Sequence, residues 1–155
     1  MVPQDMRRQY LVYLAHAISG LNFEKAFGWY EEVEKAFPRH MIALKPLRGA
    51  EWERQRLAFA GKYYDDPHLT PKEIALRCYH DVDRADALLV NLLEAKVVSR
   101  GSCAEVARAA WRKPIVVIMQ EGNPHWGDPM LEAPSIVVPT LGEGIRKIVG
   151  MVSPI

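Results

Sequence analysis

The stretch Ala87-Leu-Leu-Val-Asn-Leu92 decides the fold class, because it is a continuous apolar run with the length of a buried strand. A helix is predicted before it over 70–84, since Thr70 can cap the helix and Glu73 can bond back to the cap. Another helix is predicted after it over 102–112. An apolar strand between two helices is typical of a parallel sheet covered on both faces.

The rest of the chain alternates between strands and helices in the same way. Short apolar runs predict further strands over 11–15, 41–44, 114–119 and 136–138. Apolar residues at helical spacing predict helices over 23–37, capped by Asn22, and over about 142–149. No element is assigned in the polar region from 45 to about 69. We therefore predict one α/β domain over 1–155, a three-layer sandwich around a mainly parallel five-stranded sheet.

The composition excludes several classes of protein. Of 155 residues, 49% are hydrophobic and 25% are charged, and no apolar run approaches the ~20 residues that cross a membrane. Twenty Lys and Arg against nineteen Asp and Glu leave a net charge of +1, which favours a small-molecule ligand over a polynucleotide. Cys78 and Cys103 fit neither a disulfide framework nor a metal-site spacing. We expect a soluble cytoplasmic protein without a bound metal.

Ligands of parallel α/β sheets bind beyond the carboxyl ends of the strands. The segments to search for a site are therefore 15–20, 91–105 and 120–130. In the second segment, Ser99-Arg-Gly-Ser-Cys-Ala-Glu105 follows the best strand and opens a helix, whose free N–H groups suit an anion. An ionised Glu105 could attack an anomeric carbon and form a covalent glycosyl intermediate. Ser102 and Glu105 also form a capping box, which is the commoner role of this motif by itself.

Four separated segments, in order, resemble the nucleoside 2-deoxyribosyltransferase superfamily. They are Tyr13-Leu-Ala-His-Ala-Ile-Ser-Gly20, Ala85-Asp-Ala-Leu-Leu-Val-Asn91, Ser99-Arg-Gly-Ser-Cys-Ala-Glu-Val-Ala-Arg-Ala109 and Arg112-Lys-Pro-Ile-Val-Val117. The resemblance implies a Rossmann-like or flavodoxin-like fold and a homodimer or dimer of dimers. It also implies action on deoxyribonucleosides or nucleoside 5′-monophosphates, with no metal or organic cofactor.

The resemblance also assigns roles to single residues. Glu105 matches the nucleophile and Tyr13 the tyrosine that positions it. Ser99 and Gly101 match positions that contact phosphate in the 5′-monophosphate N-glycosidases, although Ser99 could also simply cap or turn the loop. The substrate-binding set further includes residues of the first loop, the end of the central strand and a basic loop: Ile18, Ser19, Gly20, Asn91 and Arg48. Arg48 could add a second anion contact or simply be solvated.

Two positions depart from the family pattern. Cys78 stands where the family commonly has an aspartate, and a thiol is a poor substitute because it is largely protonated at neutral pH. Asp81, one helical turn later, could supply the missing carboxylate, with a solvated helix-face residue as the commoner alternative. His16 replaces a glycine, and it could crowd the pocket, protonate a leaving base, pair with a phosphate or be structural.

The loop over 120–130 carries the last candidates. His125 lies in a loop that reaches a neighbouring subunit's site in this family, and Asp128 and Met130 lie near positions that contribute across that interface. Met130 could equally serve in packing. The sequence therefore predicts an enzyme that cleaves or exchanges the N-glycosidic bond of a nucleoside or, preferably, a nucleoside 5′-monophosphate. The alternative is a catalytically impaired nucleotide-binding protein of the same fold.

Overall fold

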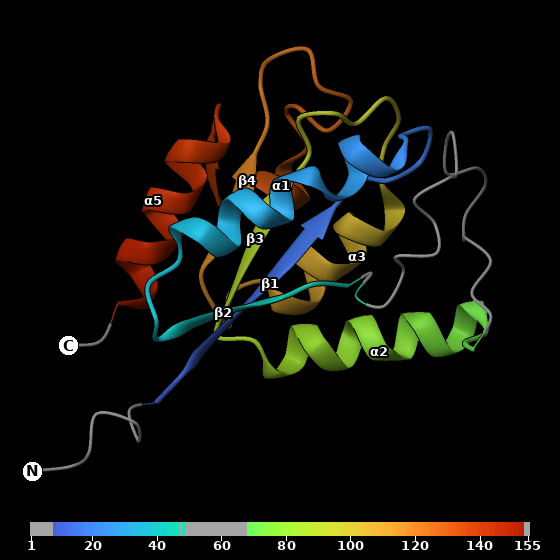
Figure 1. Ribbon diagram of the computed structural model, residues 1–155. Helices are drawn as coiled ribbons and strands as arrows, with labels where there is room; N and C mark the ends of the chain where they lie inside the picture. Colours follow the sequence, from blue (N-terminus) through green and yellow to red (C-terminus); the bar gives the residue numbers. More distant parts are fainter. Residues whose placement is uncertain (1–7, 47, 49–67, 154–155) are drawn as a thin grey trace, which may run out of the picture.

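The computed structural model describes residues 8–46, 48 and 68–153 (Figure 1). The strands are β1 Tyr10–His16, β2 Met41–Leu44, β3 Ala87–Asn91, β4 Ile115–Ile118 and β5 Ile136–Val138. The helices are α1 Phe23–Ala36, α2 Pro71–Arg84, α3 Arg100–Ala109, α4 Pro129–Glu132 and α5 Leu141–Val152. All five predicted strands and the four predicted helices are confirmed, whereas the short helix α4 was not predicted. The polar region predicted after residue 45 lies largely outside the described residues.

The five strands form one sheet in the order β2-β1-β3-β4-β5, and every neighbouring pair is parallel. This order belongs to the flavodoxin-like arrangement of the Rossmann-like folds. Helices α1 and α5 pack on one face of the sheet, and α2 and α3 pack on the other (Figure 1). Helix α1 follows β1 on one face of the sheet, and α3 follows β3 on the other. The strand order therefore reverses between these two neighbouring strands, at their carboxyl ends.

Local signals fix the helix ends. The Asn22 side chain accepts the N–H of Lys25 at the start of α1, and Thr70 and Glu73 form the predicted capping box of α2. At the far end of α2, the Lys113 ammonium donates to three backbone carbonyls, those of Val82, Asp83 and Ala85. This cation occupies the carbonyl end of the helix, where the dipole favours it.

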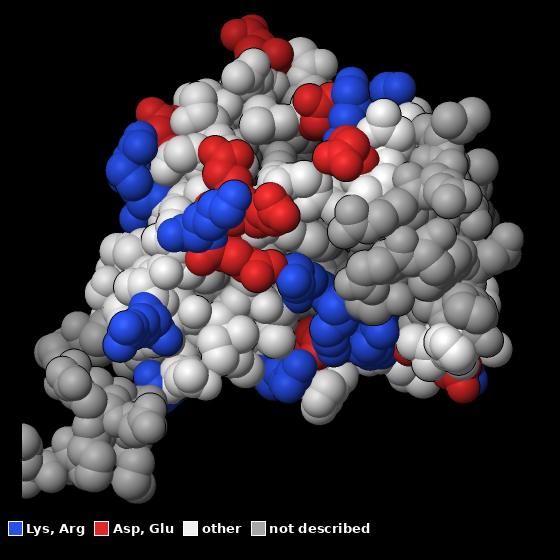
Figure 2. All heavy atoms as spheres, viewed as in Figure 1, with Lys and Arg blue, Asp and Glu red and all other residues white. Residues whose placement is uncertain are grey.

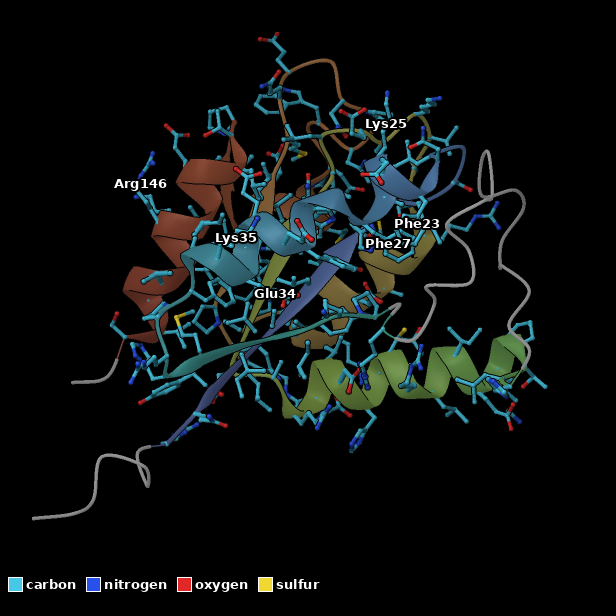
Figure 3. All side chains as sticks on the ribbon, in the orientation of Figure 1. Phe23, Lys25, Phe27, Glu34, Lys35 and Arg146 are labelled. Atoms are coloured by element: carbon cyan, nitrogen blue, oxygen red, sulfur yellow. The ribbon has the colours of Figure 1, made fainter. Side chains whose placement is uncertain are left out.

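The core divides into two layers. On the α1–α5 face, aromatic side chains of α1 pack over the sheet, and the rings of Phe23 and Phe27 stack with centroids 4.4 Å apart (Figure 3). Lys25, Glu34 and Lys35 extend from the outer side of the same helix (Figure 3). Acidic and basic side chains are interspersed over the visible surface, in keeping with the small net charge (Figure 2). None of the helices in the described part of the chain has the length and apolar character that a membrane crossing requires.

Candidate active site

Tyr13 and Glu105 meet on the α2–α3 face of the sheet. Tyr13 is on β1 and is fully buried, and its hydroxyl donates a hydrogen bond of 2.7 Å to Oε1 of Glu105 on α3. Since side chains alternate between the faces of a strand, Tyr13 projects toward α2 and α3, as the neighbouring buried Ala15 does. The structure therefore brings together the two residues for which the resemblance implied nucleophile and positioning roles.

Helix α3 starts earlier than predicted, and this changes the interpretation of Glu105. Ser99 is the N-cap, and its side chain accepts the N–H of Ser102 at 3.2 Å. Ser102 is itself buried in the first turn and its hydroxyl bonds to that of Ser99 at 2.9 Å. Glu105 consequently lies in the second turn, too far along to bond back to a cap. The capping-box interpretation of Ser102 and Glu105 is wrong.

Burial sets the protonation of this pair. Desolvation raises the pKa of Glu105 to about 7, and the hydrogen bond from Tyr13 opposes this rise. Desolvation, followed by the nearby Glu105 charge, raises the pKa of Tyr13 so that its hydroxyl stays protonated and can donate. The site thus holds a carboxyl group that titrates near neutral pH beside a fixed hydrogen-bond donor. Such a carboxylate suits nucleophilic or acid–base chemistry.

Cys78 lies next to this pair on α2, where its thiol interacts with the Tyr13 hydroxyl. Burial raises the pKa of Cys78, and the resulting neutral thiol cannot act as a carboxylate does. Packing on both core layers holds this side chain in place. Cys78 therefore contributes shape and a weak hydrogen-bonding group to the site.

Asp81 is not a solvated residue of the helix surface. It is fully buried, and its two carboxylate oxygens pair with different arginines: Oδ2 with Arg48, and Oδ1 with Arg84 at 2.9 Å. Arg48 also donates to the carbonyl of Lys45 at 3.0 Å, so the interpretation of this arginine as simply solvated is wrong. Sequence spacing could not reveal this cluster, because Arg48 and Asp81 come from segments far apart in the chain. Asp81 anchors the segment after β2 rather than offering a free carboxylate.

His16 points away from Tyr13 and Glu105. Its ring lies on the α1 face in edge contact with Phe27, Trp29 and Tyr30, and Nε2 bonds to the Tyr30 hydroxyl. Desolvation lowers the pKa of His16 to about 3, so the imidazole is neutral near pH 7. The proposals that it protonates a leaving base or pairs with phosphate as a cation therefore find no support in this geometry.

The predicted substrate loops do come together at the carboxyl edge of the sheet. Gly20 has φ 78°, a conformation that glycine adopts without strain, and its carbonyl accepts a bond of 3.3 Å from the ammonium of Lys96. Lys96 thereby connects the loop after β1 with the loop before α3. Ile18 packs against the α1-side core, and Ser19 is half-buried in the same loop.

The other predicted contacts of this edge have local roles. The Asn91 side chain accepts the N–H of Leu93 at 3.2 Å and so shapes the turn that leaves β3. Ser99 caps α3, as described above. Gly101 is exposed, and among the described residues no atom outside its chain neighbours and its own helix backbone lies within 4 Å of the point where a Cβ would stand, so this part of the first turn of α3 has room for an approaching group.

His125 is buried rather than presented to a neighbouring subunit. It is 2% exposed, and its Nε2 accepts the backbone N–H of Ser99 at 2.8 Å. Asp128 caps α4 by accepting the N–H of Met130 at 2.9 Å. Met130 is 81% exposed, and Trp126 in the same region is 47% exposed. Of the three predicted interface residues, Met130 is thus accessible to a second subunit, whereas His125 is not.

Lys96 and Asn123 were not predicted from the sequence. Lys96 lies between the best strand and the helix of Glu105, in a segment that the sequence had already indicated for a site. Its positive charge in that segment could have suggested a role there. Asn123 donates to the carbonyl of Leu92 at 2.6 Å, a contact that no local pattern could indicate. Within the described residues, no group of three or more His, Cys, Asp or Glu side chains could hold a metal ion.

Comparison with known proteins supports the fold but supplies no activity. No protein-family model matches the chain, and no curated protein matches it. Among solved structures, the chain is similar to the crystal structure of a conserved protein from Enterococcus faecalis V583, with a TM-score of 0.55. The sequence identity is 16%, and the alignment covers 92% of this chain and 96% of that one. A likeness at this identity establishes a shared α/β fold over nearly the whole length of both chains.

Proposed function

We propose that this protein cleaves or exchanges the N-glycosidic bond of a nucleoside 5′-monophosphate or nucleoside, with Glu105 as the nucleophile. The observation that supports this proposal is the hydrogen bond of 2.7 Å from the buried Tyr13 hydroxyl to the Glu105 carboxylate. The bond joins a strand and a helix on one side of the reversal point of the sheet, where ligands of this fold class bind.

In the proposed reaction, ionised Glu105 attacks C1′ while the N-glycosidic bond breaks. The bonding electrons leave with the base, which takes a proton from solvent, and a glycosyl ester forms on Glu105. Tyr13 fixes the orientation of the carboxylate through its donated hydrogen bond. Water or a second base then attacks C1′ from the opposite side and restores the free carboxylate.

A 5′-monophosphate is the favoured substrate. The first turn of α3 offers backbone N–H groups to an anion, and Gly101 leaves space for it. Lys96 adds a positive charge to the same loop. The acidic side chain of that loop, Glu94, is paired with Lys25 at 3.5 Å. These features favour a charged phosphate over a free hydroxyl group.

A nucleotide-binding protein without turnover is the second candidate. It is favoured by the neutral thiol of Cys78 and by the engagement of Asp81 with two arginines, because neither of these two candidate positions then offers a free carboxylate to the Tyr13–Glu105 pair. In this candidate the ligand site at the carboxyl edge of the sheet persists while the chemistry is lost.

We place either function in the cytoplasm, in a homodimer or dimer of dimers that needs no cofactor. Cys78 and Cys103 are free thiols, as a reducing compartment favours. The exposed Trp126 and Met130 give a second subunit apolar surface next to the candidate site.

The deciding experiment incubates the pure protein with a panel of nucleosides and 5′-monophosphates, with and without a second base, and follows base release by chromatography. We expect release, and we expect Glu105→Gln to lower its rate by roughly 10³-fold or more. Glu31→Gln, a change of an exposed acid on α1, is the matched control and should leave the rate unchanged. Absence of turnover with every compound contradicts the enzyme, and tight nucleotide binding in calorimetry without turnover selects the second candidate.

A further inference from the structure

His125 joins the two loops that follow β3 and β4. Its Nε2 accepts the backbone N–H of Ser99 at 2.8 Å, immediately before the first turn of α3. Its Nδ1 lies 2.9 Å from Oδ1 of Asn123, and the Asn123 amide nitrogen donates to the carbonyl of Leu92 at 2.6 Å. Two side chains of the loop after β4 therefore hold both ends of the loop between β3 and α3.

These contacts require one protonation state of the imidazole. Nε2 can accept the Ser99 N–H only while it carries no proton, so the single ring proton resides on Nδ1 and is donated to Asn123. A second proton on Nε2 would place two donors opposite each other and abolish the bond to Ser99. The imidazole is 2% exposed, which gives it little water as a substitute partner.

The surroundings of His125 favour the neutral form. Desolvation lowers the pKa of His125, and the negative charge of Asp128 opposes this effect. The N-terminus of α3, which faces Nε2 through Ser99, carries partial positive charge and also disfavours a cation there. The hydrogen bond is therefore formed at neutral pH and is lost on acidification.

We infer that His125 is a positioning residue, which holds the turn before α3, and through it Glu105, in the arrangement that binds and attacks the substrate. His125 acts through Ser99, because it accepts the backbone N–H of Ser99 while the Ser99 hydroxyl caps α3. The free N–H groups that follow in the first turn are thereby aimed at the carboxyl edge of the sheet. This role rests on the proposed function for its kinetic consequences, but the contact itself does not.

The contact is tested by NMR on the unmodified protein. The nitrogen shifts of the His125 imidazole should show a proton on Nδ1 alone at pH 7, and Nε2 should remain unprotonated below the ordinary titration range of histidine. The amide resonance of Ser99 should move when, and only when, His125 gains its second proton. Titration of His125 without any response at the Ser99 amide overturns the inference.

The positioning role is tested with the variants His125→Leu and His125→Gln, and with His80→Leu, at an exposed histidine of α2, as the matched control. His125→Leu should speed hydrogen exchange at the Ser99 amide and raise KM for 5′-monophosphates roughly 10-fold, as loss of one buried hydrogen bond allows. His125→Gln should restore most of both, because its amide oxygen can accept the same bond. Equal behaviour of the two variants overturns the inference.

The pH dependence of KM separates positioning from a purely structural role. For the unmodified enzyme, KM for 5′-monophosphates should rise as His125 is protonated, whereas in His125→Gln this rise should be absent. An identical rise in both proteins overturns the inference. If the unmodified protein turns over no substrate, the proposed function fails, and exchange at the Ser99 amide still decides the positioning role by itself.

Discussion

The two faces of the sheet are covered by helices in the same manner, but they bury different chemistry. On the α1–α5 face, the buried layer is apolar and aromatic, and the imidazole of His16 is kept neutral there with a pKa of about 3. On the α2–α3 face, Tyr13 and Glu105 share a hydrogen bond, and a fully buried Asp81 is paired with arginines.

This difference shows where the fold places its reactive groups. Burying a carboxylate costs free energy unless hydrogen bonds or ion pairs offset the loss of water. Among the described residues, Asp81 has two cationic partners, whereas Glu105 has the neutral donor Tyr13, and desolvation raises its pKa. The α1–α5 face contributes packing, and the α2–α3 face keeps one incompletely compensated carboxyl group, as functional sites commonly do.

The largest expected effect is on stability in Glu105→Gln. The pKa of Glu105 is raised from 4.5 to about 7, so its contribution to stability is fully present below pH 4.5 and is lost as the pH rises through 7. Replacing it should stabilise the fold by about 3 kcal/mol at pH 8 and by little near pH 4.5. Urea unfolding at both pH values measures this. A variant that is less stable than the unmodified protein at pH 8 would contradict the view that Glu105 is undercompensated.

Asp81→Asn should act in the opposite direction. It leaves Arg48 and Arg84 without their shared carboxylate, and because both arginines reach water the expected loss of stability is about 2 kcal/mol at pH 7. Asp83→Asn, at an exposed position of the same helix, is the control and should cost less. Thermal unfolding of both variants checks this. Equal losses of stability in the two variants would show that the buried ion pairs of Asp81 stabilise the fold no more than the exposed ion pair of Asp83 does.

Gly144→Ala tests how tightly the α1–α5 face of the sheet is packed. A Cβ at Gly144 would lie 2.8 Å from two side-chain carbons of Ile118, so the change should destabilise the protein by about 1–2 kcal/mol. Gly150→Ala lies in the same helix, where a Cβ would meet no described atom within 4 Å outside the helix backbone and chain neighbours, and it should stabilise the protein by about 0.5 kcal/mol. Chemical denaturation of the pair gives the difference directly. Similar values for both would mean that the α1–α5 face is loosely packed.

Tyr13→Phe should produce the smallest energetic change and the most specific one. The hydrogen bond from Tyr13 partly offsets the rise in the pKa of Glu105 that desolvation causes. Removal of this bond should therefore raise that pKa further. The acidic limb of kcat/KM should therefore move to higher pH, from near 7 in the unmodified enzyme, by about one unit or less. His16→Gln, which alters the opposite face, should leave the limb in place. Movement of the limb in His16→Gln would end the separation of the two faces.

The sequence by itself determined the fold class and the order of the five strands and the four longer helices. Apolar runs, the Thr70–Glu73 capping box and the Asn22 cap are local signals, and local physics fixes them. Alternation along β1 also implied that His16 and Tyr13, three residues apart, face opposite sides, a signal that the site prediction did not use.

Only the tertiary structure decided which polar groups meet. The Tyr13–Glu105 bond spans 92 residues, and the contacts of Asp81 with Arg48 and of His125 with Ser99 span 33 and 26. At the start of α3, the sequence had left Ser99 as a possible cap, and the tertiary structure added His125, which holds the Ser99 N–H from another loop. Such partners are chosen by the packing of distant segments, since a buried polar group must find a hydrogen bond wherever the fold supplies one.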